Sequence, residues 1–91
     1  MNRQQQLQVG KRLKEVREQT GVSIRGFEER YRFAHGYVGR VESGSSLPSE
    51  RLLWAYAALG RAHPIQLIGE TLTKLVLASQ RAIGESDYAN L

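Results

Sequence analysis

The side chains with chemical potential in this sequence are mainly basic, and they are unevenly distributed. Residues 1–42 carry nine Lys and Arg against five Asp and Glu, a balance of +4, whereas residues 43–91 carry four of each. Such a surplus on one half of a small domain is typical of a polyanion partner such as duplex DNA, because each neutralised phosphate releases condensed counterions. The charge alone is equally compatible with a role in solubility.

Enzyme chemistry has little support in the sequence. The two histidines, His35 and His63, have neither a cysteine nor a carboxylate cluster at metal-ligand spacing. Glu28 and Glu29 are adjacent, so their side chains diverge on a helix. No glycine-rich phosphate loop and no serine elbow occurs. We therefore expect a binding protein without enzyme activity, metal or cofactor.

Two short helices must position the basic residues. The first is expected over residues 23–31, with Ser23 as N-cap, and the second over about residues 35–42, ending at Ser43-Gly44. Each has one apolar side, because Phe27 and Tyr31 are four residues apart and Val38 and Val41 are three apart. The three residues between them, Arg32 to Ala34, suffice for a turn with Phe33 as a buried plug.

The run from Ser23 to Gly44, SIRGFEERYRFAHGYVGRVESG, followed by Leu47-Pro48, resembles the Xre-type helix-turn-helix of lambda-repressor-like DNA-binding domains. The resemblance extends over roughly residues 7–68. It implies an all-α, five-helix, lambda-repressor-like domain with an extended C-terminal helix. The expected parts are a helix-turn-helix core over 1–63, a long helix over 64–83 for packing and dimerisation, and a flexible tail over 84–91.

The resemblance also implies which residues meet DNA. The second helix would lie in the major groove and present five residues to the bases, with Arg40 matching guanine O6 and N7. These five are His35, Gly36, Tyr37, Gly39 and Arg40. Candidate phosphate contacts are Arg25, Ser45, Ser46, Arg12 and Arg51, the two serines through their backbone N–H groups and Tyr37 additionally through its hydroxyl. A merely solvated face is the alternative for His35 and Arg40.

Several positions depart from the family's pattern. Glu28 stands where a small residue is usual, so it must tilt to solvent or find a partner such as Arg32 or Arg40. Arg32 stands where the turn usually has glycine, and it is expected to adopt a positive φ. Ala34 stands where the family usually has a polar cap for the second of these helices. Ile24 stands where the family usually has a polar residue that clamps a phosphate. These departures, with Ser45-Ser46 in place of basic loop residues, weaken the case for DNA binding.

The remaining helices supply the scaffold. We expect one from about Gln4 or Leu7 to Gln19, with Leu7, Val9 or Gly10, Leu13 and Val16 buried, and one over 50–59 capped by Ser49. The resemblance implies an ion pair between Arg17 and Glu42. This pair would lock the helix that ends at Gln19 to the helix over about residues 35–42, which is a structural role. Trp54 is expected to pack in the core, with a partner surface as the alternative.

The wide apolar stripe after Pro64 indicates a second subunit. We expect the dimer interface to use Ile68, Leu72, Leu75, Val76 and Ser79, with closure inside one chain as the alternative. Two subunits would place two recognition helices on a palindromic site.

These observations predict a single small domain of 91 residues. The absence of cysteine fits a reducing cytoplasm, and neither a signal peptide nor a membrane-spanning stretch is visible. The expected function is that of a sequence-specific, double-stranded DNA-binding transcriptional regulator, a repressor acting as a homodimer. The alternatives are a protein-interaction module on a degenerate helix-turn-helix fold and, more weakly, an RNA-binding domain.

Overall fold

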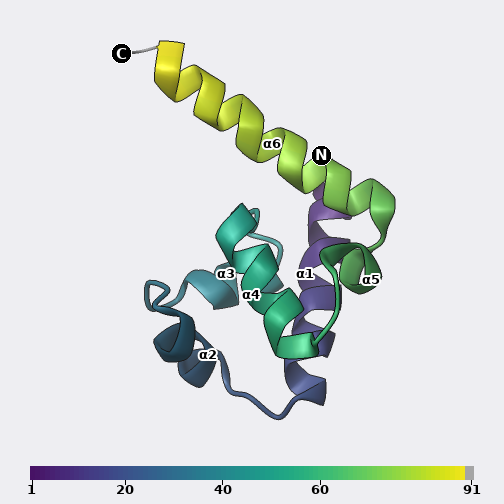
Figure 1. Ribbon diagram of the computed structural model, residues 1–91, viewed down its shortest axis with the longest axis vertical. Coiled ribbons are helices and arrows are strands. Elements are labelled where there is room, and N and C mark those ends of the chain that lie inside the picture. The colour runs from purple at the N-terminus through teal and green to yellow at the C-terminus, as the bar shows by residue number, and fades with distance from the viewer. Residues whose placement is uncertain (90–91) are drawn as a thin grey trace.

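The structure is a computed structural model that describes the backbone of residues 1–89 and the side chains of residues 1–79. It is all-helical over that backbone (Figure 1). The six helices are α1 (Arg3–Gln19), α2 (Ile24–Tyr31), α3 (Tyr37–Glu42), α4 (Glu50–Gly60), α5 (Pro64–Ile68) and α6 (Glu70–Ala89). The first five gather into one body, and the C-terminal half of α6 projects away from it.

Local capping explains where α1, α2 and α4 begin. Asn2 begins α1 with a reciprocal pair of hydrogen bonds to Gln5. Ser23 caps α2 by accepting from the Gly26 N–H at 3.0 Å, and Ser49 caps α4 by accepting from the Leu52 N–H at 3.1 Å. The predictions for both serines are therefore confirmed. Such caps can be predicted from sequence because a capping side chain and its target N–H lie within the same turn.

The core lies around α4, which contacts α1, α5 and α6. Leu52, Leu53 and Tyr56 of α4 are fully buried, and the Phe27 ring of α2 lies 4.7 Å from the Tyr56 ring. Two predictions of burial are wrong: Leu7 is 42% exposed and Trp54 is 48% exposed. Trp54 points away from the buried side of α4, since it lies about 160° around the helical wheel from the buried Leu52 and Tyr56.

The crossing of α1 over α3 depends on Gly10. A Cβ on Gly10 would lie 2.7 Å from the carbonyl oxygen of Glu42 and would also strike the carbonyl oxygen of Val41. Both obstacles are backbone atoms, which cannot turn aside. The absence of a side chain at Gly10 therefore allows α1 to approach the C-terminal end of α3 closely.

The single long helix expected over 64–83 is interrupted. Gly69 has φ 87° and ψ 162°, which ends α5 and lets α6 start in a new direction. Five helices therefore become six, because glycine adopts this conformation without the steric cost of a Cβ. The backbone of α6 then continues to Ala89, so the expected tail from residue 84 is helical as far as that residue. Residues 90–91 lie outside the described residues.

The residues predicted for a dimer interface serve largely as internal packing. Ile68, Leu72 and Val76 are 3%, 8% and 0% exposed and belong to the core of the same chain. Leu75 and Ser79 are half-buried. Ser79 also donates its hydroxyl to the Leu75 carbonyl, one turn back in α6. The bend at Gly69 turns the apolar side of α6 onto α4 and α5, so the alternative of closure within one chain describes these residues better.

Candidate nucleic-acid interface

A tight turn joins α2 to α3. Arg32, at the end of α2, has φ 59° and ψ 48°, which confirms the expected positive φ, and the Phe33 N–H donates back to the Glu28 carbonyl at 2.9 Å. Gly36, with φ 86°, precedes α3, so that helix begins at Tyr37 and not at His35. The left-handed conformation is uncommon for arginine but carries only a modest cost.

Glu28 supplies the cap that α3 lacks. Gly36 has no side chain to satisfy the first backbone N–H groups of α3, and no cap from its own segment is present. Glu28 is 3% exposed, and its Oε2 accepts from the Val38 N–H at 3.0 Å. Glu28 therefore does not tilt to solvent but finds a partner, which is the Val38 N–H and not the Arg32 or Arg40 suggested by the sequence. A carboxylate is favoured at a helix N-terminus, where the free donors and the dipole are positive.

The predicted base-reading residues separate into two groups. His35 and Arg40 are exposed, and no Cβ added to Gly39 would meet any atom within 4 Å, so this surface of α3 is open. Arg40 folds back along α3, since its Nη1 lies 3.2 Å from the place of a Cβ on Gly36. Tyr37 behaves differently.

The Tyr37 hydroxyl binds its own chain. It accepts from the Ser49 N–H at 2.8 Å and donates to the Leu47 carbonyl at 3.4 Å. It ties α3 to the start of α4, so the expectation that Tyr37 offers this hydroxyl to a base or phosphate is wrong.

The predicted phosphate contacts are only partly accessible. Arg25 is exposed, and its 3.4 Å contact with Glu29 is a surface pair of little energetic weight. The backbone N–H groups of Ser45 and Ser46 both donate to the Arg40 carbonyl, at 2.9 and 3.2 Å, so the prediction that they are free for phosphate is wrong. They satisfy a carbonyl that the end of α3 would otherwise leave open.

Arg51 and Arg12 also fall short of the prediction. The Arg51 guanidinium donates to the carbonyls of Tyr31 (2.8 Å) and Arg32 (3.1 Å) and lies 4.0 Å from the centre of the Phe33 ring. It therefore closes the end of α2. Arg12 is about 200° around the α1 wheel from Gly10, the residue that meets α3. The structure thus places Arg12 on the far side of α1.

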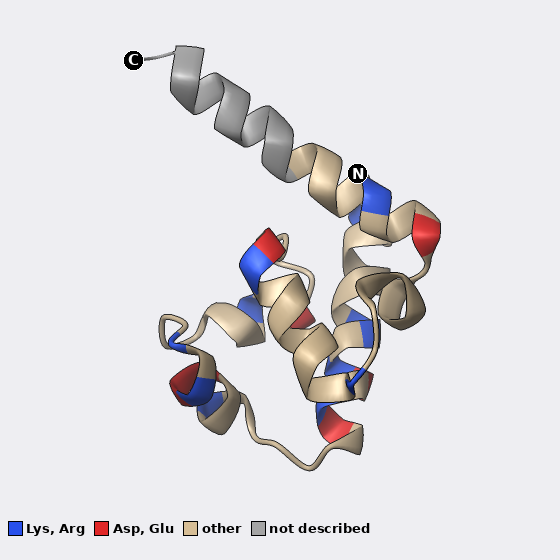
Figure 2. Cartoon of the chain, viewed as in Figure 1, with Lys and Arg blue, Asp and Glu red and all other residues tan. Residues whose placement is uncertain are grey.

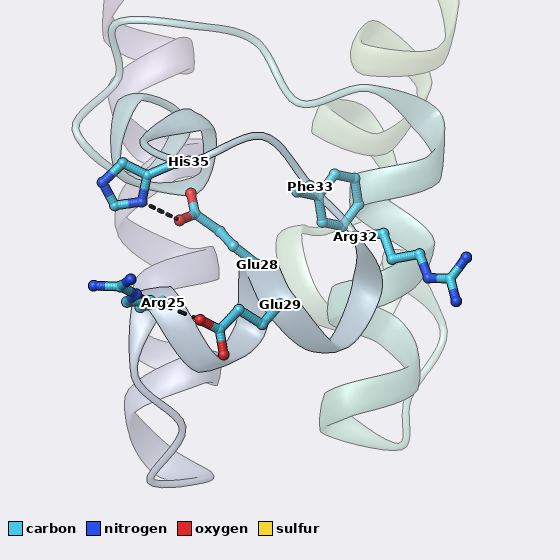
Figure 3. A pocket seen from close by; sticks show the side chains of 6 residues that line it. All are labelled: Arg25, Glu28, Glu29, Arg32, Phe33 and His35. Carbon is cyan, nitrogen blue, oxygen red and sulfur yellow. Dashed lines mark hydrogen bonds and ion pairs between the residues drawn. The ribbon is translucent and has the colours of Figure 1, made fainter.

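A shallow cavity opens where α2 meets the turn. Figure 3 shows its lining: Arg25, Glu28, Glu29, Arg32, Phe33 and His35. The His35 Nδ1 lies 3.7 Å from Oε1 of Glu28, and the imidazole is 85% exposed. Cations and carboxylates are interspersed here, and Figure 2 shows the same alternation along α2. The basic surplus of residues 1–42 is therefore not one uninterrupted patch.

The ion pair that positions α3 is present and has a third member. Arg17 Nε and Nη2 donate to the two carboxylate oxygens of Glu42 at 2.8 and 2.9 Å, and the Tyr56 hydroxyl donates to Oε2 at 2.6 Å. The hydrogen bonding that Arg17 donates to the Glu42 carboxylate raises the pKa of Arg17. Burial, reinforced by Glu42, raises the pKa of Tyr56. Sequence reasoning missed Tyr56 as a member of this network.

Two packed helices joined by a turn, with the second held from behind by a buried network and open on its outer side, define a helix-turn-helix domain. Residues 8–66 match the family described as "Helix-turn-helix domain". This match covers well over half of the chain, so the protein belongs to that family, whose members are DNA-binding domains. No curated protein and no solved structure matches the chain.

The described residues carry the features of neither a membrane span nor a metal site. None of the helices formed by them combines the length and apolar character that a membrane span needs. Within the same part of the chain, no three His, Cys, Asp or Glu side chains gather as metal ligands would.

Proposed function

We propose that the protein is a sequence-specific, double-stranded DNA-binding transcriptional regulator whose reader is α3. The observation that carries this proposal is the open outer surface of α3, where Arg40 is exposed and Gly39 faces open space, with His35 exposed in the turn just before the helix. An arginine fork there matches guanine O6 and N7, and a glycine lets the helix backbone approach the groove. Arg25, in the first turn of α2, is the remaining phosphate contact among the residues predicted from sequence, and the exposed Arg32 is an added candidate.

The proposal includes repression, a palindromic operator and a cytoplasmic location. Repression is the simplest mode of action, because a bound domain excludes other proteins from the same DNA. A dimer supports palindrome recognition, because two copies of α3 related by a two-fold axis read the same half-site twice.

The dimer contact must lie outside the internal residues of α6. Leu77 is half-buried and is not packed against the core, and the helix continues beyond the body, which favours the outer side of α6. Leu77→Glu is therefore expected to convert dimer to folded monomer in sedimentation velocity. An unchanged dimer would exclude this contact, and a wild-type monomer on and off DNA would exclude the dimer itself.

The decisive experiment is selection of binding sites from random duplex DNA, followed by affinity measurements at two salt concentrations. Wild type is expected to select a discrete site and to bind it less tightly as salt rises. Arg40→Ala is expected to lose about 1 to 3 kcal/mol and to relax the preference at one base pair. Lys74→Ala, on the exposed side of α6, is the matched loss of one cation and is expected to preserve the sequence preference.

A second candidate function is protein binding through the α4–α5 surface. Trp54 is 48% exposed and meets His63 edge-on at 5.3 Å, and Ile65 of α5 is 43% exposed. Exposed aromatic side chains are enriched at protein interfaces. If wild type binds no DNA at low salt and instead captures a polypeptide that Trp54→Ala releases, this second function replaces the first.

A further inference from the structure

Glu28 holds two parts of the reading surface at once. One carboxylate oxygen, Oε2, accepts from the Val38 N–H in the first turn of α3 at 3.0 Å, and the other, Oε1, lies 3.7 Å from the His35 Nδ1. The side chain of Glu28 is only 4% exposed, whereas that of His35 is 85% exposed. A buried acid thus lies next to an exposed imidazole, and Figure 3 shows the contact between them.

The contact defines which imidazole nitrogen faces outward. Nδ1 points at a carboxylate oxygen, an environment that favours a proton on Nδ1. Nε2 lies on the opposite side of the ring, turned away from Glu28 (Figure 3). The ring therefore presents Nε2 near the N-terminal end of α3, where recognition helices contact base edges.

We propose that Glu28 is a positioning residue for base reading by His35. The inference rests on the proposed function, since it gives His35 a base to read. Glu28 fixes the first turn of α3 through Val38 and orients the imidazole through Oε1, without touching DNA itself.

The direction in which DNA affinity changes when an acidic side chain is removed distinguishes a positioning role from a simple charge effect. A carboxylate near a DNA-binding surface repels phosphates, so removing one acid should strengthen DNA binding or leave it unchanged. Glu29 offers the matched control, because it lines the same cavity, is exposed and pairs with the exposed Arg25. A positioning role for Glu28 predicts the opposite result, that removing its charge weakens specific DNA binding.

The experiment compares Glu28→Gln with Glu29→Gln on the site selected by wild type and on random duplex DNA. Glutamine at 28 can still accept from the Val38 N–H through its amide oxygen, so it retains the cap while removing the charge beside His35. Glu28→Gln is expected to weaken specific binding about tenfold, with no loss on random DNA. Glu29→Gln is expected to leave specific binding unchanged or to strengthen it about twofold.

The double variant tells positioning from general damage. If Glu28 acts through His35, then Glu28→Gln should change affinity by less than about twofold once His35 is alanine. Equal weakening in both backgrounds, or a Glu28→Gln variant that binds like Glu29→Gln, would overturn the inference while leaving the regulator function intact. A wild type that selects no site would overturn both.

A measurement on wild type keeps the inference testable even if Glu28→Gln does not fold. The ¹⁵N chemical shifts of the neutral His35 ring are expected to place the proton on Nδ1, with His63 as an internal comparison. A neutral His35 protonated on Nε2 alone would mean that Oε1 does not orient the ring, and would refute the proposed role.

Discussion

Replacing Glu42 with glutamine tests how α3 is held in place. Glu42 is 8% exposed and accepts three hydrogen bonds, two from Arg17 and one from Tyr56. Glutamine retains one acceptor oxygen and turns an NH2 group towards donors that need an acceptor. Arg17, itself 8% exposed, then lacks its counter-charge, although the Val22 carbonyl, at 2.8 Å, still accepts from it.

The expected loss of unfolding free energy follows from that burial. Leaving one partner of a buried ion pair uncompensated costs about 3 to 5 kcal/mol. A domain of 91 residues has a total stability of about 5 to 14 kcal/mol. Glu42→Gln should therefore remove a large fraction of the stability, observed as a lower midpoint in urea followed by circular dichroism.

Two controls make the measurement specific. Glu70→Gln is the same chemical change in the exposed Lys74–Glu70 pair and should cost less than about 0.5 kcal/mol. The triple variant Arg17→Met, Glu42→Leu, Tyr56→Phe removes every member of the network and should be more stable than Glu42→Gln alone. A cost below about 1 kcal/mol for Glu42→Gln would refute the view that a buried, charge-paired network holds α1 against α3.

Two further perturbations follow from the same contacts. Gly39→Ala should raise the unfolding free energy by about 0.5 to 1 kcal/mol, because the added methyl meets no atom within 4 Å. The same variant should weaken operator binding, because the methyl would keep the α3 backbone away from the DNA. An unchanged affinity would show that α3 does not need a bare backbone at this position. Because the pKa of Tyr56 is raised in the fold, its contribution to stability is complete below pH 10.0 and falls above it by about 1.4 kcal/mol per pH unit. Tyr56→Phe should flatten that alkaline decline in urea titrations, and an equal slope in both proteins would assign it to other groups.

The sequence was most informative where a structural signal is local. Ser23 and Ser49 cap the helices that follow them, since the side chain and its target N–H lie within one turn. The interruption of the helix at Gly69 could not be predicted from the sequence, because the apolar period continues through Gly69 and only the backbone angles change. That bend converted Ile68, Leu72 and Val76 from an expected interface into core.

The start of α3 depended on a distant residue. A helix was expected from His35, with Ala34 at the cap position, but the cap comes from Glu28 on another helix and α3 starts at Tyr37. No spacing rule connects a buried acid in α2 with an N–H in α3. The loss of Ser45 as a free donor was easier to foresee, since the last carbonyls of any helix need donors from the chain that follows.

The departures from the family's pattern bear on whether DNA reading has been retained. Glu28, in place of a small residue, caps α3 and lies beneath His35, and Arg32, in place of glycine, adopts the left-handed turn while its carbonyl accepts from Arg51. Both changes therefore preserve the α2–α3 geometry and leave Arg40 exposed. Neither gives a reason to expect loss of DNA binding. Only departures that remove a phosphate contact, such as Ile24, which packs against the core, still weaken that case. A domain that keeps its reading helix but has lost a phosphate contact should bind DNA with an affinity that is low, steeply salt-dependent and sequence-selective. Binding of a partner that does not depend on salt would instead favour protein binding through the Trp54 surface.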